Sequence, residues 1–340
     1  MRLRIAHLSD LHLPTPDAPE GQQWLSKRMI GYANWFGKRR HWHQLAVLDA
    51  LAADIKQNRV DVVLISGDII NIALQSEYEA AARWLRQAFG DMPVVIAPGN
   101  HDLYAPIPWE QSLAHWTQWL TGLRRHEAQS RACSSFDDFP FLREFAILDA
   151  QELSVANSGG VAIIVANSAP PGGTSSARGR LGSEQIADIG ALLTEAGRKQ
   201  QYRILMLHHP VQEDVVAIHK KLIDQQALRD KLVSCGVELI LHGHAHLSHV
   251  GSLTTRSGEA LVLGVGSASH IRAAGAFAAG RYHWLDFTRD GSGRNKMSLT
   301  LREWDPEARN FSTPGTGPES KSQPQTEREA EIAASFGTVT

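Results

Sequence analysis

Short runs of consecutive apolar residues recur along the chain, and each run ends at a polar or charged residue. Runs of about four to eight such residues are typical of strands that are buried on both faces. We therefore predict strands at residues 3–8, 60–65, 94–97, 161–166, 204–207, 237–241 and 261–265.

Helical patterns, with apolar residues three or four positions apart, lie between several of these strands. We predict helices over about 45–55, 76–89, 183–196 and 217–234. Ser76 with Glu79 is a candidate capping box for the second helix, and Ser183 is a candidate cap for the third. Alternating strands and helices predict a layered α/β fold, which we place in one domain over residues 1–305.

Three segments stand outside this alternation. Residues 14–44 combine Trp, Tyr and Phe with Lys and Arg, and residues 104–145 are rich in tryptophan. For both segments the simpler interpretation is core packing, while the second is also a candidate cap over a site. Residues 306–340 are rich in Pro, Gly, Ser, Thr, Gln and Glu, which predicts a disordered tail.

Composition and charge narrow the classes of protein. The 340 residues are 43% hydrophobic, which excludes wholesale disorder, and a net charge of −2 makes a nucleic-acid partner improbable. We find no secretory signal or membrane-spanning run, and Cys133 and Cys235 form no metal or redox motif. The expected location is the cytoplasm, with a peripheral membrane position as a second expectation. Sixteen histidines form a surplus, and imidazole is the commonest side-chain metal ligand.

Metal-ligating side chains directly follow several of the predicted strands. These side chains are Asp10, His12, Asp68, Asn100, His101, Asp102, His208, His244 and His246. Ligands of open α/β sheets bind beyond the carboxyl ends of strands, so we expect these loops to meet at one site. Carboxylates, an amide and imidazoles together suit Mn²⁺, Fe²⁺ or Zn²⁺ better than Ca²⁺. Two such ions need a shared anionic ligand, for which Asp68 is the candidate.

In chain order these loops contain D-x-H, GD, GNHD, HHP and GHxH. The chain thereby resembles the calcineurin-like metallophosphoesterase family over about residues 2–302. The resemblance implies an αββα fold, a layered β-sandwich core flanked by helices, and two divalent metal ions that hydrolyse phosphoester bonds. In that chemistry the ions polarise the phosphoryl oxygens, and a water bridging them attacks phosphorus in line.

The resemblance also implies a role for each residue. Asp10, His12, Asp68 and His246 would hold one ion, and Asp68, Asn100, His208 and His244 the other. His101 would contact the phosphate or protonate the leaving oxygen, and Asp102 would orient the His101 ring.

The remaining histidines have simpler interpretations. His7 is expected in the core, His242 beneath the site, and His209 beside the ligand His208. We expect His41, His43, His249 and His270 to lie on the surface.

Among the branches of the family, the bacterial cyclic-nucleotide phosphodiesterases are most similar. The similarity lies in the stretch 67–78 that ends in Glu77-Tyr78, in Gly179-Arg180-Leu181-Gly182, in His208-His209-Pro210 and in the Gly266-Ser267-Ala268-Ser269 stretch. The protein phosphatases and DNA-repair nucleases carry acidic residues after GD, where this chain has Asn71. The expected substrate is a small phosphodiester or nucleotide-type molecule.

Two alternatives remain open for the role of segment 14–44, because hydrolysis of a small cyclic nucleotide does not require such a segment. It could shape a pocket for an anionic substrate, or contact anionic lipid through its aromatic and basic residues. The second option fits a UDP-diacylglucosamine-type lipid pyrophosphatase at the membrane surface. The alternative to an enzyme is a non-catalytic scaffold that binds metal. The sequence leaves the oligomeric state open.

Overall fold

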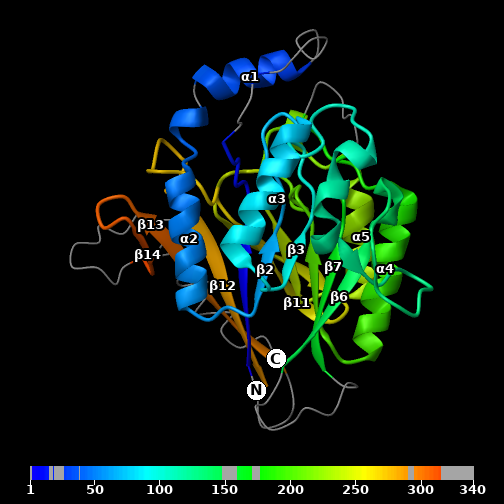
Figure 1. The fold of residues 1–340 in the computed structure, drawn as a ribbon. Coiled ribbons are helices and arrows are strands. Elements are labelled where there is room, and N and C mark those ends of the chain that lie inside the picture. The colour runs from blue at the N-terminus through cyan, green and yellow to red at the C-terminus, as the bar shows by residue number, and fades with distance from the viewer. Residues whose placement is uncertain are drawn as a thin grey trace.

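The computed structural model describes residues 2–14, 18, 27–37, 39–147, 159–170, 177–289 and 295–314. Two six-stranded sheets stack face to face, and helices cover their outer faces (Figure 1). The first sheet has the order β14-β13-β12-β1-β2-β3 and the second the order β10-β11-β9-β8-β7-β6. The predicted layered α/β fold is confirmed.

The first sheet contains β1 (Arg2–Leu8), β2 (Val62–Ile65), β3 (Val94–Ile96), β12 (Arg281–Arg289), β13 (Asn295–Asp305) and β14 (Asn310–Ser312). The second contains β6 (Phe141–Ala146), β7 (Gly160–Val165), β8 (Tyr202–Met206), β9 (Leu239–His242), β10 (His249–Thr255) and β11 (Gly258–Gly264). The strands β1, β2 and β3 run parallel to one another, as do β7, β8, β9 and β11. Their carboxyl ends therefore lie at the same end of each sheet.

The five α-helices of the described residues are α1 (Lys27–Gly37), α2 (Leu45–Gln57), α3 (Gln75–Phe89), α4 (Ser183–Arg198) and α5 (Gln225–Cys235). Figure 1 shows α2 and α3 over the first sheet and α4 and α5 over the second. Alternate residues of β7 explain this layering. Val161 and Ile163 belong to the core that includes the first sheet, whereas Ala162 and Ile164 belong to a second core with α4 and α5.

Three helix starts differ from the sequence-based prediction. Helix α4 begins at Ser183 itself, directly after Gly182, and no side chain caps it, so Ser183 is not the predicted cap. Helix α3 begins at Gln75, and the carboxylate of Glu77, not a Ser76–Glu79 box, accepts the N–H groups of Asn71, Ile72 and Leu74. The predicted helix over 217–234 is a 3₁₀ turn, η6 (Ile218–Lys220), followed by α5. In α3 the Glu77 carboxylate thus reaches back to the N–H groups of the loop before the helix, as the third residue of a capping box does.

The tryptophan-rich segment 104–145 contributes to the core. It forms the 3₁₀ helices η3 (Trp109–Gln111), η4 (Leu113–Trp119) and η5 (Phe136–Asp138) and a small hairpin of β4 (Thr121–Gly122) and β5 (Arg131–Ala132), and it ends in β6. Trp116 is fully buried, and its indole N–H donates to the carbonyl of Tyr78 in α3. Helix η4 buries Leu113, Trp116 and Trp119, so its apolar side chains pack into the core.

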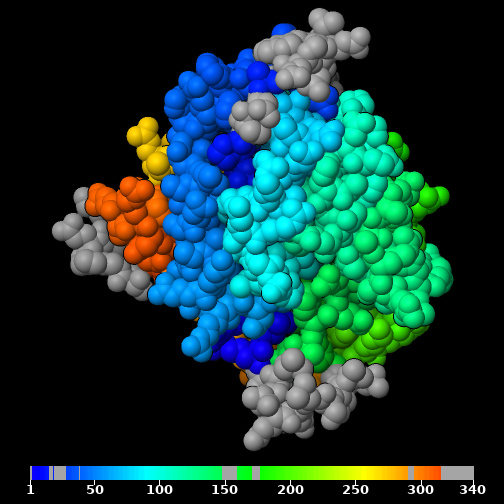
Figure 2. Space-filling model, in the orientation of Figure 1, coloured from blue at the N-terminus to red at the C-terminus, as the bar shows by residue number. Residues whose placement is uncertain are grey.

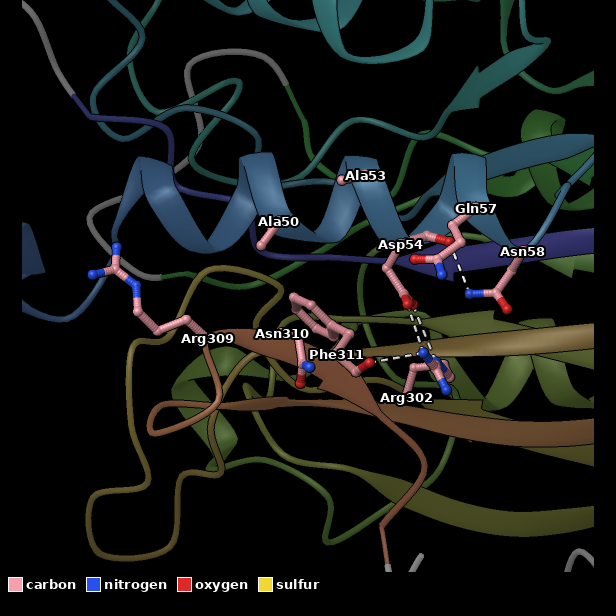
Figure 3. Close-up of a pocket in the computed structure, with 9 residues that line it drawn as sticks. All are labelled: Ala50, Ala53, Asp54, Gln57, Asn58, Arg302, Arg309, Asn310 and Phe311. Carbon is pink, nitrogen blue, oxygen red and sulfur yellow. Dashed lines mark hydrogen bonds and ion pairs between the residues drawn. The ribbon is translucent and has the colours of Figure 1, made fainter. Parts of the chain in front are cut away.

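The ordered chain continues past residue 306, where the sequence predicted the start of a disordered tail. Residues 310–312 form β14, which pairs with β13, and Phe311 is buried. A pocket of about 470 Å³ lies between α2 and these strands (Figure 3). Asp54 and Arg302 form an ion pair in its wall, so α2 is tied to the end of the sheet. Residues 315–340 lie outside the described residues.

No helix in the described part of the chain has the length and apolar character needed to cross a bilayer.

Candidate metal centre

The loops that follow β1, β2, β3, β8 and β9 meet at one end of the stacked sheets. The first two run side by side, because the N–H groups of Asp10 and His12 donate to the carbonyls of Gly67 and Asp68. The last two are joined by a hydrogen bond from the N–H of Gly243 to the carbonyl of His208. The two sheets thus contribute to the same site, as the positions of the motifs predicted.

The side chains form two clusters that share one carboxylate. Ligand atoms of Asp10, His12, Asp68 and His246 lie within 4.8 Å of one another, and so do those of Asp68, His208 and His244. The Asn100 amide oxygen is buried without a hydrogen-bond partner. The structure thus brings six of the seven candidate ligands together in the two groups named above, and the place of Asn100 in the second group stays a prediction.

The backbone is strained at these positions. Asp10, His12, Asp68, His244 and His246 have positive φ angles of 52°, 42°, 55°, 68° and 55°. Non-glycine residues rarely adopt this conformation, and where they do the strain is commonly associated with a functional site. Gly99 is required nearby, because a Cβ there would lie 2.2 Å from the Asp68 carboxylate.

Backbone carbonyls fix the orientation of three imidazoles. His12 Nδ1 lies 3.3 Å from the carbonyl of Ile70, His208 Nδ1 lies 2.7 Å from that of Ser66, and His244 Nε2 lies 3.0 Å from that of Lys220. A carbonyl accepts only, so each of these nitrogens carries the proton. The other nitrogen of each ring therefore faces the site and is the one available to a metal ion, as in metal-bound histidines.

Ring nitrogens that face the site lie close together. His208 Nε2 and His244 Nδ1 are 3.2 Å apart, and His12 Nε2 and His246 Nε2 are 3.3 Å apart. Two ring nitrogens at such a distance need a proton or a cation between them, because two bare lone pairs would repel each other. The donor chemistry of the centre therefore fits two divalent ions.

Electrostatics favour charged ligands in the same place. Burial alone would raise the pKa of Asp68, but His208 and His101 outweigh burial and hold that pKa well below its usual range. Burial would likewise lower the pKa of His208, yet Asp68, 3.3 Å from its Nε2, raises it to about 9. The site is arranged to keep Asp68 ionised at neutral pH.

Asp102 differs from its expected role. Its carboxylate accepts the backbone N–H groups of Gly99, Asp68, Ile69 and Ile70 at 2.8–3.1 Å, so it holds the loops that carry the ligands. The carbonyl of Asn71 orients the His101 ring instead, at 2.5 Å from Nδ1.

The surface prediction for two histidines is wrong. His43 and His270 are buried, and their rings lie 4.7 Å apart beside the metal ligands. His43 also forms a third cluster with His12 and His246. No local sequence signal marked His43: the contacts that hold it here are tertiary, since Ser269 Oγ lies 2.7 Å from His43 Nδ1 and Ser267 Oγ donates to the carbonyl of Asp10.

His41 is exposed as expected, whereas His249 is half-buried rather than on the surface, and three further histidines lie as expected. His7 is buried in β1 with its Nε2 2.9 Å from Ser66 Oγ, and His242 is buried directly before the GHxH loop. His209 is buried beside its neighbour His208, and its Nδ1 lies 2.8 Å from Ser168 Oγ.

Two residues that we did not assign to the site contact His101. Tyr104 stacks on the His101 ring with the planes 12° apart and the centroids 5.4 Å apart. Arg39, in the 3₁₀ helix η2 (Arg39–His41), lies with Nη1 3.0 Å from His101 Nε2. Nothing in the local sequence distinguishes Arg39 from Arg40, so only the fold shows which of the two reaches the site.

Comparisons with known proteins agree with this geometry. The profile of the family described as calcineurin-like phosphoesterase matches residues 3–248. A dimetal phosphatase from Danio rerio superposes with a TM-score of 0.53 at 15% identity, covering 92% of this chain and 98% of that one. A purple acid phosphatase from yellow lupin (Lupinus luteus) seeds has the same TM-score at 11% identity, covering 92% of this chain and 53% of that one. A search of curated protein sequences gave no match.

Proposed function

Because this chain belongs to the calcineurin-like phosphoesterase family and is a metal-dependent phosphoesterase, we propose that it hydrolyses small phosphodiesters, a cyclic nucleotide or a related nucleotide-type diester. The observation that carries the proposal is the pair of ligand clusters that share Asp68. Asp10, His12, Asp68 and His246 would hold one ion, and Asp68, Asn100, His208 and His244 the other. We favour Mn²⁺, Fe²⁺ or Zn²⁺ from the mixture of oxygen and nitrogen ligands.

The chain's own residues prepare the site for an anionic substrate. When bound, two divalent ions supply Lewis-acid polarisation of a phosphoryl oxygen and make a bound water more acidic. His101 Nδ1 donates to the carbonyl of Asn71, so its Nε2 is the nitrogen that can accept or pass on a proton at the substrate. Tyr104 stacks on this ring and limits its rotation.

Preference for a diester rests on the stretch that resembles cyclic-nucleotide phosphodiesterases. Within it, Glu77 holds the loop N–H groups of Asn71 and Ile72, and the Tyr78 hydroxyl donates to the carbonyl of Asp102. The residues that carry this resemblance therefore support the loops that present Asp68 and His101.

A substrate panel tests the proposal. We expect the purified protein, loaded with Mn²⁺, Fe²⁺ or Zn²⁺, to hydrolyse bis-p-nitrophenyl phosphate and at least one cyclic nucleotide, with a higher kcat/KM than for p-nitrophenyl phosphate. Preference for the monoester would contradict the diester specificity. An absence of turnover with every metal and substrate would favour the non-catalytic scaffold.

A lipid-linked phosphoester is the second candidate substrate, and the exposed surface of the insert favours it. Helix α1 and the turn after it expose Met29, Ile30, Phe36 and Trp42 by 47%, 60%, 50% and 40%. The guanidinium of Arg40 lies 3.9 Å over the Phe36 ring, so a cation accompanies the apolar side chains. This segment lies on the surface at the end of the molecule where the strands β1 and β2 terminate (Figure 2). Such a surface suits contact with anionic lipid, as a UDP-diacylglucosamine-type pyrophosphatase at the cytoplasmic membrane surface would require.

Vesicle flotation tests this candidate. We expect the wild type to float with vesicles that contain phosphatidylglycerol, and the Ile30→Ser/Phe36→Ser double variant to bind at least about tenfold more weakly, since each side chain loses roughly 1.5–3 kcal/mol of burial. Val233→Ser, which alters an exposed residue of α5, is the matched control and should float like the wild type. A wild type that remains in the dense fraction without vesicles would exclude lipid contact.

A further inference from the structure

Arg39 is a cation held at the metal centre. Its Nη1 lies 3.0 Å from His101 Nε2, and within the described residues it has no carboxylate at ion-pair distance. Burial lowers the pKa of Arg39, although Asp68, Tyr104 and Asp10 act in the opposite direction. Arg39 is half-buried, and partial desolvation of a guanidinium without an ion pair is a cost that an anionic ligand would offset.

The position of Arg39 is fixed by the backbone around it. The N–H groups of Trp42 and His43 donate to the Arg39 carbonyl, which closes the η2 turn. The segment is then joined to the loop after β11, because the N–H of Gln44 donates to the carbonyl of Ser269 and the N–H of Ile271 to that of Trp42.

The other end of the insert is fixed as well. The Arg28 guanidinium donates to the carbonyls of Ile72 and Ala73, in the loop that follows Asp68. Gly31 packs so closely that a Cβ there would lie 2.6 Å from the Ile72 side chain and about as close to Tyr104. The insert is thus attached on both sides of the metal centre, and Arg39 needs little rearrangement to meet a ligand.

We propose that Arg39 binds a non-bridging oxygen of the phosphoryl group that the centre receives. The inference rests on the proposed function and assigns the insert to substrate binding at the same site. Bound divalent ions would neutralise the carboxylates that attract Arg39, so a phosphoryl oxygen becomes its remaining anionic partner. A planar guanidinium forms directed, charge-assisted hydrogen bonds to phosphate oxygens, which a lysine ammonium reproduces only in part.

His101 and Arg39 would then act together on the substrate. The Arg39 N–H that now donates to His101 Nε2 would donate to the phosphoryl oxygen instead, which frees that imidazole nitrogen. Such a fixed cation would stabilise the charge that develops on the phosphoryl oxygens, as preorganised donors do in other hydrolases.

Binding of inorganic phosphate to the Mn²⁺-loaded protein tests the inference without requiring turnover. By isothermal titration calorimetry we expect Arg39→Ala to weaken phosphate binding at least tenfold, and Arg39→Lys to weaken it less. Arg40→Ala, one position along the same 3₁₀ helix, should stay within twofold of the wild type. Equal metal content and equal melting temperature would show that the variants keep their fold and their ions.

Two outcomes would overturn the inference: Arg39→Ala binds phosphate as the wild type does, or the loaded wild type binds no phosphate. Neither depends on catalysis, so the inference can fail while the enzyme is active, and it can hold where the chosen diesters are not substrates. If the wild type hydrolyses a diester, we expect Arg39→Ala to lower kcat/KM by about a hundredfold.

Discussion

Replacing Asp68 by alanine should remove both metal ions and lower kcat for a phosphodiester by at least about a thousandfold, because metal ions supply several kcal/mol of transition-state stabilisation. Asp68 belongs to both ligand clusters, and its Oδ2 lies 3.3 Å from His208 Nε2 and 4.0 Å from His12 Nε2. Without it the second cluster keeps no carboxylate, the first keeps only Asp10, and the two clusters lose the ligand that they share. Metal content by elemental analysis and kcat with bis-p-nitrophenyl phosphate measure the two effects.

A buried carboxylate elsewhere supplies the control. Asp54 is 8% exposed and pairs with Arg302 far from the ligand loops, so Asp54→Asn should lower the melting temperature while it leaves the metal content unchanged. An Asp68→Ala protein that retained two ions per chain would show that the shared ligand has been wrongly identified.

Replacing Asp102 by alanine should destabilise the fold by roughly 3–5 kcal/mol, since it leaves buried backbone donors without an acceptor. Four N–H groups, those of Gly99, Asp68, Ile69 and Ile70, donate to this carboxylate. Burial, together with the nearby Asp68, raises the pKa of Asp102 to about 7. Keeping this carboxylate ionised in the folded protein therefore costs free energy, and the alanine variant would no longer bear that cost. The four hydrogen bonds outweigh that cost, and urea unfolding at neutral pH measures the difference.

The size of this effect separates two roles for Asp102. If its main role were to orient the His101 ring, Asp102→Ala would lower kcat and leave the free energy of unfolding nearly unchanged. Asp102→Asn keeps one carbonyl oxygen as an acceptor, so its free energy of unfolding should lie between those of the wild type and Asp102→Ala. An alanine variant as stable as the wild type would contradict the structural role.

The strands that the sequence revealed are those buried on both faces. Val161 to Val165 and Val62 to Ile65 are apolar at every position, because helices or a second sheet cover both sides. Strands β12 and β13 escaped prediction, since polar side chains such as Asp286 and Arg302 interrupt their apolar residues. Partly exposed strands of this kind are difficult to distinguish from loops by composition.

The candidate ligands could be predicted because each follows a strand within a few residues, so local sequence determines where it lies. Arg39 and His43 could not, because their distance from the metal centre depends on how the insert folds back onto the loop after β11. Only tertiary structure separates Arg39 from its neighbour Arg40 and places His43 beside His12.

Each ligand cluster draws on both sheets. Asp10, His12 and Asp68 follow strands of the first sheet, whereas His208, His244 and His246 follow strands of the second. Ions bound there would be coordinated by side chains from both sheets and would link them. Their binding energy would therefore add to the stability of the folded chain. Metal supply in the cell would then govern how long the molecule persists as well as whether it is active.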